Sequence, residues 1–202
     1  MAINLQKGQK VSLKKTAPTG LGEILVNLNW NSQPIRKGFF SSLFGGGSSG
    51  IDLDLGCLFE LKDGRKGTVQ ALGNAFGSLS NPPYISLDGD DRTGASAAGE
   101  NLRINGNQIS RIKRILVYTF IYEGVANWQQ ADATVTIKYP GAEDLVVKMD
   151  SYNTQNRMCA LALLENVNDE TFSVEKIVQF YMGHKDMDQA FKWGLNWVPG
   201  RK

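Results

Sequence analysis

Most of this chain alternates apolar and polar residues in steps of two, and this pattern restricts its fold more than any other feature. The apolar side chains of Ile24 to Trp30 and of Ile51 to Leu61 would each line one face of a half-buried β-strand. The second run ends at Lys62 to Arg65, where an Asp-Gly pair is typical of a tight hairpin turn. The alternation therefore predicts strands joined by short turns.

The same pattern continues along the chain and predicts six further strands, at Thr68 to Leu72, Arg111 to Glu123, Ala133 to Tyr139, Leu145 to Met149, Arg157 to Glu165 and Phe172 to Tyr181. Helical periodicity is confined to a short segment around Asp186 to Trp193, where Asp186 would cap the N-terminus. We predict an all-β fold, an antiparallel β-sandwich with one short C-terminal helix, forming a single domain over residues 1–202.

Charge and composition exclude several classes of protein. The net charge of +2 is too small for a nucleic-acid surface, so we interpret the basic run RIKRI (Arg111 to Ile115) as a solvated strand face. No apolar stretch approaches the about 20 residues of a membrane span, and residues 1–10 lack the apolar core of a signal peptide, which predicts a cytoplasmic protein. Cys57 and Cys159 are expected to be reduced core thiols, and with His184 they are too few for zinc.

Residues 37–50, KGFFSSLFGGGSSG, interrupt the strand pattern with a cluster of apolar residues and a tract of glycine and serine. We interpret this segment as a flexible insertion between two strands. Its aromatic residues, Phe39 to Phe44, would either fold back over a sheet edge or bind a partner protein or a membrane surface.

Two acidic groups suggest a cation site. Alternation places Asp52 and Asp54 on one side of a strand with about 7 Å between them. The glycine-rich stretch from Leu87 to Asn101 adds four more carboxylates, those of Asp88, Asp90, Asp91 and Glu100. Its spacing does not fit an EF-hand, because arginine and threonine fall at loop positions five and six. Either a solvated acidic turn or a bound calcium ion would relieve the repulsion.

The combination of GIDLDLGCLFEL with LDGDDRTG and GEN resembles the TerD family of tellurium-resistance and bacterial stress proteins, along essentially the whole chain. The tail GHKDMDQAFKWGLNW is similar to the TerA branch of that family. The resemblance implies a calcium-binding β-sandwich without catalytic activity. The ligands that it implies are the six carboxylates above, backbone oxygens near Arg92 and Thr93 and, as weaker candidates, Glu123 and Glu165.

This chain departs from the family pattern in two places. Gly50 replaces a further aspartate before the DLD pair, and Ala95 to Ala98 replace an acidic run after RTG. Fewer carboxylates predict weaker binding or a single occupied site.

Catalytic arrangements find little support in the sequence. His184 is the one imidazole, has no nucleophile motif beside it and is expected to be an exposed residue before a helix, near Asp186 and Asp188. Paired carboxylates can hydrolyse glycosidic bonds in an aromatic cleft, but the four tryptophans, Trp30, Trp128, Trp193 and Trp197, are more often core or subunit contacts. We therefore expect no enzyme activity.

The sequence thus predicts a non-enzymatic calcium-binding stress-response or tellurite-resistance protein, whose ion-ordered acidic loop forms an interaction surface. Its expected partners are other stress or tellurite-resistance proteins, with association at a membrane or into oligomers as further options and no nucleic acid. The alternative is a module that binds a small ligand, a sugar or a nucleotide, in a calcium-dependent way.

Overall fold

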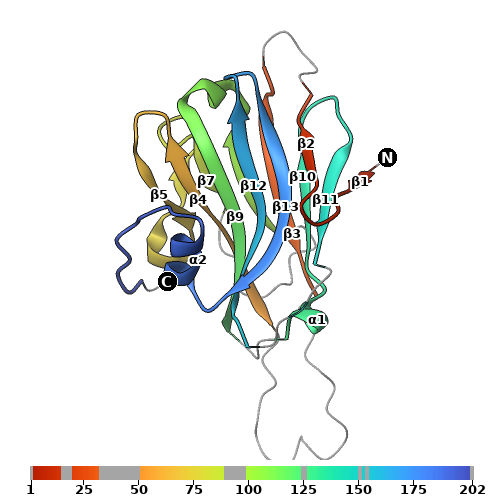
Figure 1. Cartoon of the computed structure of the whole chain (residues 1–202), viewed down its shortest axis with the longest axis vertical. Coiled ribbons are helices and arrows are strands. Elements are labelled where there is room, and N and C mark those ends of the chain that lie inside the picture. The colour runs from red at the N-terminus through yellow and green to blue at the C-terminus, as the bar shows by residue number, and fades with distance from the viewer. Residues whose placement is uncertain are drawn as a thin grey trace, which may run out of the picture.

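The computed structural model describes residues 2–14, 20–31, 51–88, 99–123, 127–149, 152 and 155–200. Two β-sheets lie face to face in this part of the chain (Figure 1). The strand pairs are antiparallel, apart from one parallel pair at the edge of a sheet. The predicted all-β sandwich with a short C-terminal helix is confirmed.

In spatial order, the seven-stranded sheet contains β1 (Ala2–Asn4), β11 (Asp144–Lys148), β10 (Thr134–Lys138), β3 (Glu23–Asn29), β8 (Glu100–Asn105), β7 (Ile85–Leu87) and β6 (Gly77–Ser78). The six-stranded sheet contains β2 (Lys10–Ser12), β13 (Thr171–Tyr181), β12 (Met158–Val167), β9 (Ile112–Glu123), β4 (Asp52–Leu61) and β5 (Lys66–Gln70). The helical segments are α1 (Trp128–Ala131), α2 (His184–Ala190) and the 3-10 turns η2 (Leu72–Asn74) and η3 (Gly106–Arg111).

Each of the eight strands predicted from alternation overlaps an observed strand, whereas the short strands β1, β2, β6 and β7 and the strand β8 were not predicted. The predicted helix start is wrong by two residues. α2 begins at His184, so that Asp186 lies in its first turn, with its Oδ2 accepting a hydrogen bond of 3.1 Å from Met182 N. Gly183 occupies the capping position instead.

The main core lies between the two sheets. Val26 and Leu28 of β3 and Leu53 and Leu55 of β4 are fully buried there. Burying one such aliphatic side chain stabilises the fold by roughly 1.5–3 kcal/mol, so this layer holds the sandwich together. The two cysteines, on β4 and β12, are buried free thiols, as predicted.

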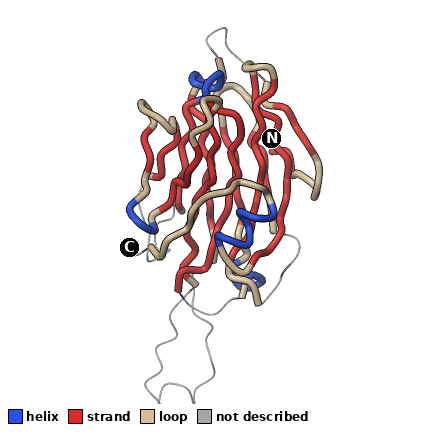
Figure 2. The backbone as a smooth tube through the Cα atoms, turned by 60° about the vertical axis from the view of Figure 1, so that its left-hand side comes forward, coloured by secondary structure: helices blue, strands red, loops and turns tan. Residues whose placement is uncertain are grey.

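A second apolar cluster covers the outer face of the six-stranded sheet. Tyr118 and Phe120 of β9 pack there with Met187 of α2 and with Trp193. In Figures 1 and 2, α2 and the loop that follows it lie across the outside of these strands. β4 is therefore buried on both faces, and the prediction of a half-buried strand is wrong because the C-terminal segment shields it.

No helix in the described part of the chain is long and apolar enough to cross a bilayer. The predicted insertion at residues 37–50 lies outside the described residues.

Candidate metal centre

The first half of β4 carries two buried carboxylates. Asp52 is 8% exposed and Asp54 is fully buried, and the atoms Asp52 Oδ1 and Asp54 Oδ2 have no contact with solvent. Asp52 lies opposite Glu123 of β9, and Asp54 lies opposite Phe120. Removing charged carboxylates from water is costly, so this end of β4 needs compensating positive charge or hydrogen bonds.

Glu100 reaches the same region from the other sheet. It is the first residue of β8, is 2% exposed, and accepts a hydrogen bond of 2.6 Å from Leu55 N through Oε2. The donor is available because β5 pairs with β4 only from Gly56 onward. The two sheets thus bring Asp54 and Glu100, separated in sequence by the whole of β5 to β7, to one end of the sandwich.

Gly99 fixes the way in which the chain enters β8. Its φ of 64° lies in the left-handed region, and a Cβ atom there would stand 2.0 Å from Leu28 O. A larger residue would therefore displace either β3 or the start of β8. This constraint sets where residues 89–98 rejoin the described fold, directly before Glu100.

Asp88 has a different environment from the residues on β4. Its Oδ1 and Oδ2 accept hydrogen bonds of 2.6 and 2.8 Å from Arg103 Nε, and Arg103 Nη1 also donates to Glu23 Oε1 at 2.5 Å. The hydrogen bonds that Arg103 donates to both carboxylates, to Asp88 first and then to Glu23, raise the pKa of Arg103. The charge of Asp88 is thus balanced within the protein.

The structure separates the two weaker candidates. Glu123 is exposed at the end of β9, beside Asp52 in the register. Glu165 lies opposite Arg114 at the far end of the sheet, and its Oε2 is 3.5 Å from Lys10 Nζ. Because Arg114 also lies opposite Glu60, nearly the whole length of β4 separates Glu165 from Asp52, and Glu165 does not belong with the acidic residues at the start of β4.

The described residues alone contain no group of three or more histidine, cysteine or carboxylate side chains able to hold a metal ion. Four of the predicted ligands lie outside the described residues, namely Asp90, Asp91, Arg92 and Thr93.

A group of asparagines near this end was not predicted. Asn27 Nδ2 donates to Asn101 Oδ1 at 2.8 Å, and Asn29 Nδ2 donates to Asn27 Oδ1 at 2.5 Å. The alternation of asparagines in NLNW was the available signal, although it gave no indication of the pairing with β8. The amides tie β3 to the start of β8, next to Glu100.

His184 is not the exposed residue that was predicted. Its Nε2 lies 2.9 Å from Gln70 Oε1, and its ring makes edge-to-face contacts with Tyr118 and Phe120 and a tilted contact with Trp197, with centroids 4.8–5.5 Å apart. Burial lowers the pKa of His184 to about 4, so the imidazole is neutral at pH 7. The burial comes from segments remote in sequence.

Asp188, a near neighbour of His184 in the sequence, binds the residues after α2 and not the imidazole. It is 4% exposed, and its carboxylate accepts hydrogen bonds from Gly194 N at 2.8 Å, Leu195 N at 2.9 Å and Trp197 Nε1 at 3.0 Å. Asp188 therefore fixes the chain that follows α2 against the sheet.

A cavity of about 210 Å³ opens beside this histidine, lined among others by Phe120, Arg157, Met182 and His184. Phe120 is the register neighbour of Asp54. The cavity thus borders the strand pair that carries the buried acidic residues.

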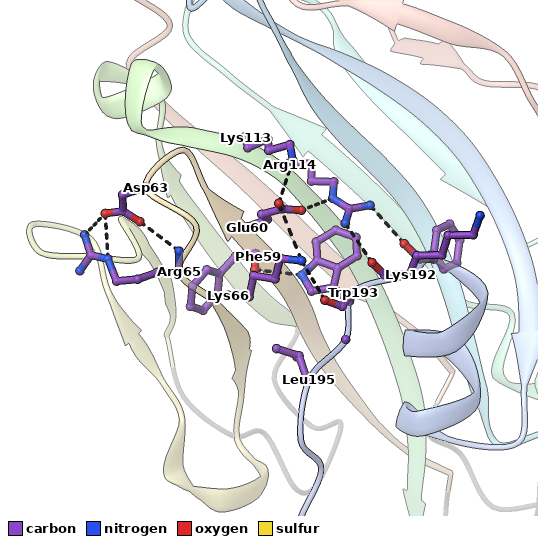
Figure 3. A network of polar contacts seen from close by, with 12 residues as sticks. Phe59, Glu60, Asp63, Arg65, Lys66, Lys113, Arg114, Lys192, Trp193 and Leu195 are labelled. Carbon is purple, nitrogen blue, oxygen red and sulfur yellow. Dashed lines mark hydrogen bonds and ion pairs between the residues drawn. The ribbon is translucent and has the colours of Figure 1, made fainter.

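At the other end of β4, Glu60 is 6% exposed and lies among three cations (Figure 3). Lys113 Nζ donates to Oε1 at 2.8 Å, Arg114 Nε donates to Oε2 at 2.6 Å, and Lys66 Nζ is 3.9 Å from Oε1. Burial alone would raise the pKa of Glu60, but the hydrogen bonds from Lys113 and Arg114 outweigh burial and hold it below its usual range.

Arg114 also binds the C-terminal segment (Figure 3). Its guanidinium carbon lies 3.8 Å from the centroid of the Trp193 ring, and its Nη1 donates to Phe191 O at 3.2 Å. Trp193 Nε1 in turn donates to Phe59 O at 2.9 Å. The prediction that RIKRI forms a solvated face is therefore wrong for Arg114.

The fold is a β-sandwich in which β4 carries two buried aspartates near one end and Glu100 of the other sheet contacts the backbone of the same strand. The family model described as the TerD domain matches residues 1–140, and the chain belongs to this family. The resemblance stated from the motifs is confirmed.

Relatives and solved structures agree with this assignment. The chain is 42% identical over 200 residues to "Tellurium resistance protein TerA" from Alcaligenes sp., covering 96% of this chain and 58% of that protein. It is 34% identical over 132 residues to "Stress response protein SCP2" from Bacillus subtilis (strain 168), covering 64% and 65%. The chain thus spans less than two thirds of the length of either relative.

A solved structure also resembles this protein. It is that of a homologue of telluride resistance protein (TerD) from Streptomyces coelicolor A3(2), and it superposes with a TM-score of 0.59 at 17% identity. The superposition covers 84% of this chain and 95% of that one, which shows that the two share a fold.

Proposed function

We propose that this TerD-family protein is a non-enzymatic calcium-binding protein of a stress or tellurite response. One observation carries the proposal: Asp52, Asp54 and Glu100 are almost fully buried and come from both sheets to one end of the sandwich. Like charges that are buried near one another favour a bound cation, and carboxylate oxygens suit calcium.

Calcium takes six to eight oxygens and tolerates irregular loop geometry, which suits a site that combines a strand with a glycine-rich segment. Asp52 and Asp54 would supply ligands from β4, while Glu100 and Glu123 lie within the same end of the fold. The remaining oxygens would come from Asp90, Asp91 and the backbone near Arg92 and Thr93. Asp88 would contribute only if its ion pair with Arg103 opened.

Binding of the ion would fix residues 89–98 against the start of β4 and so create an interaction surface. The partners proposed for this surface are other stress or tellurite-resistance proteins, including assemblies at a membrane and oligomers of this chain. We expect the protein to act in the cytoplasm.

Isothermal titration calorimetry with calcium tests the proposal. The folded protein should bind calcium at millimolar or lower concentration, and Asp54→Asn should weaken binding on the order of tenfold or more, because a hard cation loses a charged ligand. Asp144→Asn is the matched control, since Asp144 lies half-exposed on β11 in the other sheet. Absence of binding to the folded wild-type protein would overturn the proposal.

A second candidate function is calcium-dependent binding of a small polar ligand, a sugar or a nucleotide. The cavity beside Phe120 and His184 favours it, because aromatic and polar groups line a space next to the strand pair that carries Asp54. A glycan and nucleotide binding screen with and without calcium separates the two functions. Ligand binding that appears only with calcium and is lost in Phe120→Ala would support this candidate.

A further inference from the structure

A second cavity, of about 320 Å³, lies at the end of β4 remote from Asp52 and Asp54. Its wall is formed by the β4–β5 turn, which contributes Lys62 and Arg65, and by the end of η3, which contributes Arg111. The turn and the end of η3 are held together by a hydrogen bond of 2.9 Å from Lys62 N to Arg111 O. Cationic side chains from two separate segments therefore surround one hollow.

The three cations in this wall outnumber its one carboxylate, that of Asp63, whose pKa is lowered chiefly by hydrogen bonds from Arg65 and also by the charge of Arg111. Asp63 accepts hydrogen bonds from Arg65 Nε at 2.9 Å and from Arg65 Nη2 at 2.5 Å, and Lys62 forms an ion pair with Asp169. Arg111 has no ion-pair partner among the described residues. Both existing pairs are about half-exposed and therefore weak, so an incoming anion can share their cations.

The neutral groups in the wall are also able to donate hydrogen bonds. Tyr84 is only 8% exposed, yet its hydroxyl forms no hydrogen bond with the residues that the structure describes. Tyr84 and Arg65 line the same cavity. Ser110 adds a second hydroxyl to the wall.

The backbone of Tyr84 is held in an unusual conformation. Its φ is 64°, in the left-handed region that bulky side chains avoid, and hydrogen bonds from Tyr84 N to Asn81 O and from Asn105 N to Tyr84 O fix it there. Strained conformations of this kind occur preferentially at binding sites, where they aim a side chain at a ligand.

We propose that this cavity binds a phosphate group, either as free phosphate or on a small phosphomonoester. Three cations and two hydroxyls offer many donors, and arginine matches the oxygens of a phosphate with paired N–H groups. The volume exceeds what one phosphate fills, and Leu61 supplies an apolar part of the wall for the body of an ester. This proposal is independent of calcium binding.

Calorimetric titration at constant ionic strength, with inorganic phosphate in one arm and ribose 5-phosphate in the other, tests the site. Saturable binding of either ligand by the wild-type protein is expected. Equal affinities would identify the free anion as the ligand, and at least tenfold tighter binding of the ester would identify the phosphomonoester. Absence of saturable binding in both arms at millimolar concentration would overturn the proposal.

Two variants and one control localise the binding. Arg111→Gln should weaken phosphate binding on the order of tenfold or more, because a charge-assisted hydrogen bond is lost. Tyr84→Phe should weaken it by a factor of about three to ten while keeping the ring. Lys185→Gln removes the same charge from an exposed position on α2 and should leave binding unchanged. An equal loss of phosphate affinity in Lys185→Gln and Arg111→Gln would show that the protein attracts phosphate only through its overall charge, and would overturn the proposal.

Discussion

The two ends of β4 hold buried carboxylates in opposite ways. At the end of the strand, Glu60 is neutralised by side chains of the chain itself, with Lys113, Arg114 and Lys66 around one carboxylate. At its start, Asp52 and Asp54 are buried where the proposed neutralising group is an ion from solution. One strand thus carries Glu60, which side chains of the protein neutralise, and the Asp52 and Asp54 pair, which we propose a bound ion neutralises.

The difference teaches where stability and regulation reside in this fold. The Glu60 group ties β4 and β9 to the C-terminal segment through the Trp193 ring, and it is present whenever the chain is folded. A site completed by calcium would stabilise the folded protein only when the ion is bound. The free energy of unfolding would then rise with the logarithm of the ratio of the calcium concentration to the dissociation constant. The first end is therefore structural, whereas a calcium site at the second end would respond to the concentration of the ion.

Removing a cation beside Glu60 should have the largest effect on the free energy of unfolding. Arg114→Ala removes a hydrogen bond to Glu60, the contact with the Trp193 ring and a donor to Phe191 O. Loss of one partner of a buried pair costs about 3 kcal/mol of unfolding free energy, and Lys113 keeps the cost from being higher. Urea denaturation followed by tryptophan fluorescence measures the loss. Lys7→Ala, at an exposed lysine, is the control, and a change below about 0.5 kcal/mol in Arg114→Ala would contradict the role given to this end.

The strands and the acidic site were predictable from the sequence to different degrees. Alternation located the long strands, since each buries one side chain in two against the other sheet. It missed β8, although Leu102 and Ile104 alternate with polar residues, because the acidic stretch before them drew the interpretation toward a loop. It identified Asp52 and Asp54 as an unusual pair, but it did not predict their burial, because it treated this strand as half-buried.

The rest depends on contacts between distant segments that no local pattern encodes. Glu60 and Arg114 look like ordinary surface residues in the sequence, and their burial follows from the path of the residues after α2. The environment of His184 likewise requires Gln70 of β5 and Tyr118 of β9. The family resemblance supplied the candidate ligands, but it did not indicate the ion pair between Asp88 and Arg103.

His184 sharpens the comparison because it is a half-buried titratable group, next to the outer face of the six-stranded sheet, whose pKa is shifted by burial and not by a charged partner. Its pKa of about 4 lies below the ordinary value of 6.5. Between pH 6.5 and 4 the histidine is therefore protonated in the unfolded chain but neutral in the folded protein, which favours unfolding. Stability should therefore fall between pH 6.5 and 4 by roughly 3 kcal/mol from this residue. The protein has a single histidine, so one imidazole resonance in an NMR titration gives the pKa directly.

A variant separates this contribution from that of the carboxylates. His184→Gln should lose the part of the pH dependence between pH 6.5 and 4 that belongs to the imidazole. A histidine that titrates near pH 6.5 in the folded protein would mean that the residues after α2 do not cover this face in solution.

The comparison of the two ends is tested most directly by neutral substitutions, although the expected effects are the smallest. Glu60→Gln leaves Lys113 and Arg114 beside an uncharged amide and should destabilise the fold by about 2 kcal/mol. Asp54→Asn, in buffer containing a calcium chelator, should be neutral or stabilise by up to about 1 kcal/mol, because repulsion from Asp52 and Glu100 is reduced. Added calcium should stabilise the wild-type protein and leave Asp54→Asn nearly unaffected. Thermal unfolding of both variants in chelator and in calcium gives the signs. If both substitutions destabilise equally and calcium alters neither the wild-type protein nor the variants, the two ends of β4 are neutralised in the same way, by the protein itself.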